Sequence, residues 1–212
     1  MCKARDQSFI GSFSQNLFPN FHWLSAVTVI ITTQLTFFIA SVSLNGLSDN
    51  SFLAVPEESL VTVGAKDTYL MRYNYQMWRF LTANVLHYDI VHLLCNMLGM
   101  LIIGQTLEKD MGTLNFTTAV FIIGFGATLF SAMNSNEVTC GGSPVLYGFV
   151  GIFMACLIVN WTWFKDNKEK RCKVLIGTLL TILVALSTDM FHVDPFGNLG
   201  GFLVGIMSGL WL

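Results

Sequence analysis

Three short stretches of this sequence carry side chains that could do chemistry together. His92 and Asn96 are four residues apart, Ser143 follows two glycines in GGSPVLYG, and Asn198 lies in PFGNLGGFLVG. Polar groups inside apolar segments are costly to bury and usually have a functional reason. These residues are therefore the first candidates for a functional site.

The chain that holds these residues is strongly apolar. Its 212 residues are 53% hydrophobic and 11% charged, with a mean hydropathy of +0.60 and a net charge of −2. This composition is far from that of a soluble domain and predicts a multi-pass membrane protein, and it gives no sign of nucleic-acid binding. The five cysteines lack the spacing of a metal site. We expect no metal and no cofactor.

Long apolar segments predict the fold class. Because a helix needs about 20 apolar residues to cross a bilayer, we expect an all-α bundle of six transmembrane helices that forms one domain over residues 23–212, after a cytosolic segment 1–22. The predicted spans are about 23–44, 84–107, 114–133, 143–164, 174–188 and 196–212. The long first loop ends in YLMRYNYQMWRFL, a composition typical of chain at the membrane interface.

The basic residues predict the orientation of these spans. Eight of the 11 lie in the N-terminal segment and in the loops after the second and fourth spans, and three lie in the first loop. The positive-inside rule then places both termini in the cytosol, in a membrane that the sequence does not identify. With this topology the even-numbered spans all begin on the outer side, which brings His92, Ser143 and Asn198 to a similar depth.

Helical spacing suggests which faces of the spans meet. Ser143, Tyr147 and Gly151 share one face of the fourth span. Glycines recur at every fourth residue of the sixth span, a spacing that lets two helix backbones approach closely. These glycines are Gly197, Gly201, Gly205 and Gly209. If the two faces pack together, Asn198 comes to lie beside Ser143.

Each of these features also has a simpler explanation. A His/Asn pair at this spacing can hydrogen-bond neighbouring helices, and a serine at a helix start commonly caps the helix, with Pro144 suited to the first turn. Repeated glycines are a packing motif first. Polar residues in spans also line permeation paths, so a transporter or channel is an alternative, although no inverted repeat is visible.

Five motifs, in the expected order, resemble the rhomboid family of intramembrane serine proteases. They are the W-R pair and the H-x-x-x-N helix in WRFLTANVLHYDIVHLLCN, the E-x-x-x-G turn in LEKDMG, the G-x-S motif with a following tyrosine in GGSPVLYG, and the sixth-span segment VDPFGNLGGFLVG. Together they cover about residues 78–212. The resemblance implies a six-helix bundle that opens outward and cleaves single-span membrane proteins.

The resemblance also implies a role for each matching residue. Ser143 matches the nucleophile, and His92 and Asn96 match the donors to the oxyanion. Gly141, Gly142 and Tyr147 match the positions that support the site. The structural positions of the family match Trp78, Arg79, Glu108, Gly112, Gly201, Gly205 and Gly209.

Asn198 matches the general-base histidine of the family and is not a histidine. Imidazole can accept a proton near neutral pH, whereas a carboxamide cannot, because its nitrogen is only a donor and its oxygen is weakly basic. Pro144 is a second departure, at a position where the family usually has glycine. His192 and His87 stay open as substitute bases. The sequence also leaves open whether Asn198 is natural or introduced.

We therefore expect a catalytically impaired rhomboid-like protein, a pseudoprotease that resides in a lipid bilayer and binds transmembrane helices of single-span client proteins. The alternative is an active intramembrane serine endopeptidase with Ser143 as the nucleophile.

Overall fold

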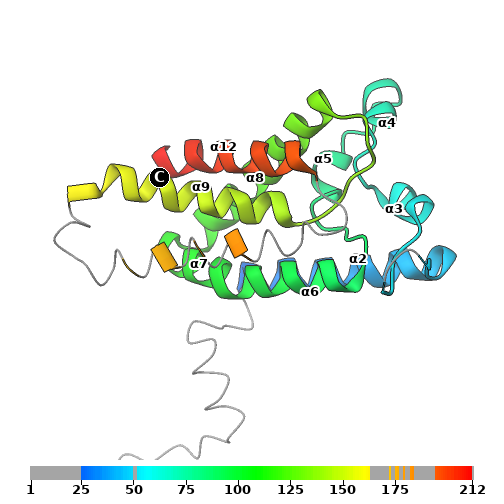
Figure 1. Cartoon of the computed structure of the whole chain (residues 1–212), viewed down its shortest axis with the longest axis horizontal. Coiled ribbons are helices and arrows are strands. Elements are labelled where there is room, and N and C mark those ends of the chain that lie inside the picture. The colour runs from blue at the N-terminus through cyan, green and yellow to red at the C-terminus, as the bar shows by residue number, and fades with distance from the viewer. Residues whose placement is uncertain are drawn as a thin grey trace, which may run out of the picture.

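A computed structural model describes residues 25–49, 52–162 and 194–211, together with isolated residues between 172 and 183. Every named secondary-structure element in these ranges is a helix, accompanied by two isolated β-bridges. The helices are α2 (Ala26–Asn45), α3 (Glu57–Val63), α4 (Thr68–Tyr73), α5 (Arg79–Thr82), α6 (Ile90–Gly99), the π-helix η1 (Met100–Gly104), α7 (Gln105–Met111), α8 (Thr113–Asn134), α9 (Ser143–Val159) and α12 (Pro195–Trp211). Figure 1 shows the long helices side by side, with α3, α4 and α5 gathered at one end.

The long helices confirm the membrane class predicted from the sequence. Three of them are long and apolar enough to cross a bilayer: α2, the continuous helix Ile90–Met111, and α8. The shorter apolar helices α9 and α12 have 17 residues each. These five correspond to the first four predicted spans and the sixth. Residues 1–22 and most of the predicted fifth span, 174–188, lie outside the described residues, so the count of six stays a prediction.

The second span begins later than we predicted. We expected its start near residue 84, but the helix begins at Ile90 because Asp89 caps it. Asp89 has an extended backbone, and its carboxylate accepts a hydrogen bond from the His92 N–H at 2.7 Å. Before the helix, residues 83–85 form a turn and residues 86–89 have no regular secondary structure.

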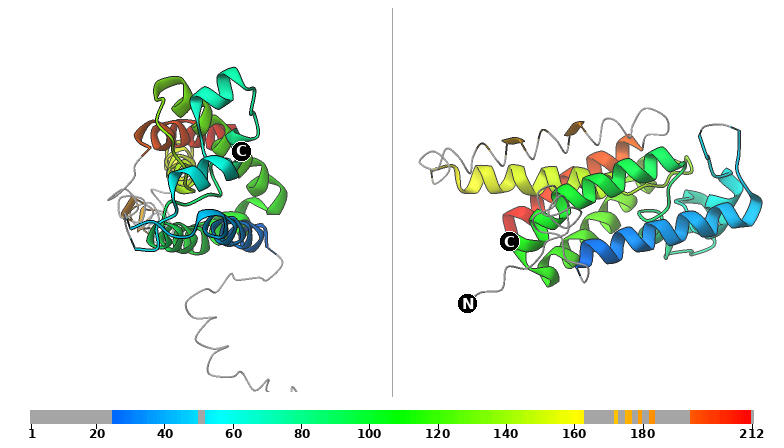
Figure 2. Two further views of the ribbon diagram at one scale, coloured as in Figure 1. Left: turned by 90° about the vertical axis from the view of Figure 1, so that its right-hand side faces the viewer. Right: turned by 90° about the horizontal axis from the view of Figure 1, so that it is seen from below.

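The closest helix contact joins α9 and α12, which lie against each other in Figures 1 and 2. A Cβ atom added at Gly201 would overlap the carbonyl of Pro144, and one added at Gly205 would overlap the carbonyl of Gly148. The predicted packing of the sixth-span glycines on the fourth span is therefore confirmed. Because Asn198 lies one turn before Gly201, it stands at the end of α12 that meets the start of α9.

The buried Arg79 holds the segment between α2 and α6 in place. Its guanidinium donates hydrogen bonds to the carbonyls of Val61 at 2.8 Å and Ala65 at 2.6 Å, and to Gln76 Oε1 at 2.8 Å. Its neighbour Trp78 is exposed. The arginine of the W-R pair therefore has an internal structural role. The position of this segment at a membrane interface stays a prediction.

Glu108 joins the starts of two helices. Its carboxylate accepts hydrogen bonds from the N–H groups of Ala26 at 2.9 Å and Val27 at 3.1 Å, and from the Thr113 hydroxyl at 2.9 Å. A negative charge at a helix N-terminus is favourable because it meets the positive end of the helix dipole. Gly112 ends α7 with a φ of +80°, a conformation that favours glycine. The E-x-x-x-G motif thus ties α2, α7 and α8 together.

Candidate active site

The loop before α9 sets the position of Ser143. Gly141 has a φ of +145°, and its N–H donates to the Ala83 carbonyl at 2.9 Å. Gly142 is the N-cap residue, and Ser143 is the first residue of α9 with only 6% of its surface exposed. The Ser143 side chain makes no capping hydrogen bond. The simpler explanation of Ser143 as a helix cap is therefore wrong, because Gly142 holds the cap position and the Ser143 hydroxyl does not cap the helix.

His92 and Asn96 lie on a buried face of α6 beside this loop. A Cβ atom added at Gly141 would lie 2.7 Å from His92 Cε1 and 3.6 Å from Ser143 Oγ, so only glycine leaves room between the two side chains. A Cβ atom added at Gly142 would lie 3.3 Å from Asn96 Oδ1. The structure therefore brings together the predicted nucleophile, the two predicted oxyanion donors and both glycines. In the present conformation Asn96 Nδ2 donates to the His92 carbonyl at 2.9 Å.

Asn198 and Tyr147 are the remaining two side chains of the predicted site. Asn198 is 5% exposed in the first turn of α12, and its backbone N–H donates to the Asp194 carbonyl at 2.9 Å. Tyr147 lies one turn after Ser143 on α9 and is half-buried. Within the described part of the chain, no side chain hydrogen-bonds Ser143 Oγ.

His87 has a larger part in the site than the sequence suggested. It is fully buried, its ring packs edge-on against His92 with centroids 5.1 Å apart, and its Nε2 accepts a hydrogen bond from the Gly142 N–H at 3.4 Å. Burial, aided by the neighbouring His92, holds the pKa of His87 well below its usual range. The imidazole is therefore neutral, and its acceptor nitrogen supports the serine loop. The other substitute base considered, His192, lies outside the described residues.

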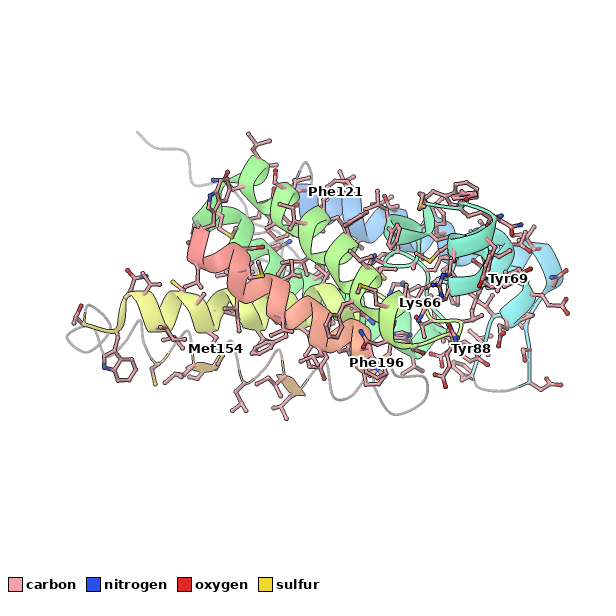
Figure 3. All side chains as sticks on the ribbon, turned by 90° about the horizontal axis from the view of Figure 1, so that it is seen from above. Lys66, Tyr69, Tyr88, Phe121, Met154 and Phe196 are labelled. Carbon is pink, nitrogen blue, oxygen red and sulfur yellow. The ribbon has the colours of Figure 1, made fainter. Side chains whose placement is uncertain are left out.

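A buried polar cluster that the sequence did not predict fixes the start of α12. Lys66 Nζ donates to Ser131 Oγ at 2.8 Å, and the Asp194 carboxylate accepts from the hydroxyls of Ser131 and Thr139 and from the Gly197 N–H at 2.8 Å. Lys66 is 1% exposed, and Figure 3 labels it where the first loop meets α8. Burial lowers the pKa of Lys66, and the charge of Asp194 opposes this effect.

Most of this cluster lines a small pocket that also contains Ser143 and Gly141; the members in its wall are Lys66, Thr139, Asp194 and Gly197. The cluster joins the first loop, α8, the loop after α8 and the start of α12. It therefore holds the helix that carries Asn198 in register with the serine loop. Asp194 directly before Pro195 is a helix-start signal that the sequence did offer. No sequence signal marked Lys66.

Comparison with known proteins agrees with these motifs. A family model for the Rhomboid domain matches residues 74–212. The chain belongs to the rhomboid family. It is 29% identical over 174 residues to RHOMBOID-like protein 1 of Arabidopsis thaliana, which covers 81% of this chain and 44% of that relative. It is 33% identical over 172 residues to RHOMBOID-like protein 6, mitochondrial, of the same plant, covering 80% of this chain and 55% of that relative.

A protozoan relative matches over a greater length. The chain is 29% identical over 203 residues to Rhomboid-like protease 2 of Toxoplasma gondii, covering 95% of this chain and 70% of that relative. The match to the two plant proteins, in contrast, spans about half of their length. These comparisons confirm the family predicted from the sequence motifs.

Proposed function

We propose that this rhomboid is a catalytically impaired member that binds transmembrane helices of single-span client proteins. The observation that carries the proposal is Asn198. It stands at the family's general-base position, on the turn of α12 that precedes the contact of Gly201 with α9. The frame of a serine hydrolase is thus built around a residue that cannot act as its base.

The size of the expected defect follows from the chemistry of the missing base. A serine hydroxyl stays protonated near neutral pH, and the Asn198 carboxamide cannot remove the proton. Loss of the histidine from a serine-protease triad lowers kcat on the order of 10⁶-fold, which corresponds to about 8 kcal/mol of barrier. The absence of a hydrogen bond from Ser143 Oγ to any described residue supports the same conclusion.

The scaffold supports a binding role because the internal contacts that shape the bundle are intact. Arg79 holds the first loop, Glu108 joins α2 to α8, and the α12 glycines seat that helix on α9. A bundle of this kind can admit a client helix from the bilayer without cutting it. Retention of the client or its protection from active relatives would be the consequence.

The alternative is an active intramembrane serine endopeptidase with a substitute base. Ser143, His92 and Asn96 support it, because the candidate nucleophile and oxyanion donors meet. It needs His192 or a rearranged His87 to accept the serine proton. In the described conformation His87 Nε2 is engaged with the Gly142 N–H instead.

Proteoliposomes with a single-span reporter test both functions. Four proteins are compared for cleavage: the chain as given, Ser143→Ala, Asn198→His and the double variant Asn198→His/Ser143→Ala. A photocrosslinker in the reporter helix measures binding. We expect crosslinking by all four proteins and cleavage only by Asn198→His. Cleavage by the unchanged chain that Ser143→Ala abolishes would contradict impaired catalysis, and absence of crosslinking would contradict client binding.

A further inference from the structure

A cavity of about 400 Å³ lies between α2, α5, η1, α8 and the start of α9, apart from the Ser143 pocket. Its walls are almost entirely apolar, with Val120 and Phe121 from α8 facing Val29 and Ile30 from α2. Val29 and Phe121 are themselves more than half exposed, and Figure 3 shows Phe121 beside α2. Because these helices are membrane spans, the cavity opens toward lipid. Its volume is within the range of small-molecule sites.

One polar atom in the wall of this cavity has no hydrogen-bond partner among the described residues. Gln34 on α2 is 1% exposed and lines the cavity, and its Oε1 accepts no hydrogen bond from the residues that the structure describes. The nearby hydroxyls do not satisfy it, since Thr33 donates to the Val29 carbonyl at 2.8 Å and Thr117 to the Thr113 carbonyl at 2.7 Å. A buried acceptor that receives no hydrogen bond is costly. A ligand that brings a donor to this atom would remove that cost.

A second amide at the same end of the cavity offers no donor to Gln34. Asn84 Nδ2 already donates to the carbonyls of Phe80 and Gly124 and to the Thr128 hydroxyl, at 2.9 to 3.2 Å. A lone water would find too few polar partners in such a cavity to be well held. The combination of one acceptor and a long apolar wall therefore fits an amphiphile.

We propose that the cavity binds a single-chain membrane lipid that carries a hydroxyl, such as a monoacylglycerol or a fatty alcohol. The hydroxyl donates to Gln34 Oε1, and the alkyl chain runs along α2 toward Ala26. Ala26 and Gln34 both line the cavity and are eight residues apart, a span of about 12 Å on a helix. This binding does not rest on the function proposed above, because Ser143 is not part of the cavity wall.

The bound lipid would touch the loop of the candidate active site. Gly142 forms part of the cavity wall, and its N–H donates a hydrogen bond to His87 Nε2. A Cβ atom added at Gly142 would lie 2.9 Å from Gln34 Nε2, so the amide of Gln34 and this loop are in close contact. The lipid hydroxyl would therefore bind next to the residue that precedes Ser143.

Photolabelling in phosphatidylcholine nanodiscs tests the proposal. The probe is hexadecanol with a diazirine in mid-chain, and its methyl ether is the matched probe that lacks the donor. Labelled peptides are mapped by mass spectrometry in the unchanged chain, Gln34→Leu, Val120→Trp and Ile122→Trp. Val120→Trp fills the cavity, whereas Ile122→Trp adds the same ring at an exposed position of the same helix.

We expect the alcohol to label α2 and α8 about fivefold more than the ether, as one hydrogen bond predicts. Gln34→Leu should abolish that preference, and Val120→Trp should remove the labelling that Ile122→Trp retains. Equal labelling by both probes in the unchanged chain would overturn the hydroxyl assignment. Labelling that Val120→Trp leaves unchanged, in a variant that melts as the unchanged chain does, would overturn the site.

Discussion

Arg79 gives the sharpest test of how the first loop is held. Its guanidinium is 4% exposed and makes hydrogen bonds of 2.8 and 2.6 Å to the carbonyls of Val61 and Ala65. Arg79→Met keeps much of the apolar stem but leaves both carbonyls without their donor. Each unsatisfied carbonyl costs about 1–3 kcal/mol. Because Val61 is partly accessible to water, we expect a total loss of about 2–4 kcal/mol in the free energy of unfolding.

The assay is thermal unfolding in detergent, followed by tryptophan fluorescence, with Arg72→Met as the matched control. Arg72 lies in the same segment but is exposed, with its guanidinium 6.0 Å from the Tyr73 ring centre. Arg79→Met should lower Tm by roughly 5–15 °C, whereas Arg72→Met should change the free energy of unfolding by less than about 1 kcal/mol. Equal Tm values for the two variants would refute the assignment of Arg79 as the anchor of this loop.

Three further predictions follow from packing and from buried titratable groups. Gly205→Ala places a methyl group against the α9 backbone and should destabilise the fold by about 1–3 kcal/mol. The methyl group of Gly104→Ala meets only side-chain atoms, of Met100 and Val27, and should cost less in the same unfolding assay; the reverse order would contradict the close contact of the helices. Because the pKa of His87 is lowered on folding, the unfolded chain alone takes up this proton as pH falls through about 6.5. The free energy of unfolding should therefore fall by up to about 1.4 kcal/mol per pH unit below that value. His87→Gln should flatten the dependence of Tm on pH between pH 7.5 and 5.5. The same dependence in both proteins would exclude a neutral His87. The pKa of the Cys140 thiol is raised to about 12, chiefly by burial. Maleimide should therefore modify the exposed Cys172 at least about a hundredfold faster at pH 7.4; similar rates would contradict the raised pKa of Cys140.

The sequence predicted the parts of the site that follow from periodicity. Regular spacing placed His92 and Asn96 on one face of a helix, and the glycines of α12 predicted a close contact with α9 that the structure contains. These patterns are local, so a single helix suffices to read them. Hydrophobicity alone misplaced the start of α6, because the cap made by Asp89 depends on one polar side chain within an otherwise apolar run.

The parts that the sequence missed depend on contacts between distant segments. Lys66 becomes buried only because the first loop folds onto α8, where Ser131 Oγ accepts a hydrogen bond from its ammonium group. Gln34 is buried by the loop before α9, and His87 gains its role from the N–H of Gly142, which lies 55 residues away in the chain. No local pattern of residue types marks such contacts, which is why Lys66 and Gln34 were absent from the predicted site and His87 was considered only as a substitute base.

Labelling by a serine-directed fluorophosphonate in lipid measures the central claim most directly. The unchanged chain, Ser143→Ala and Asn198→His are compared under the same conditions. An impaired rhomboid predicts no labelling of the first two proteins and labelling of Asn198→His, because the restored imidazole can activate Ser143. Labelling of the unchanged chain that disappears in Ser143→Ala would contradict the claim and would show that another base serves this serine.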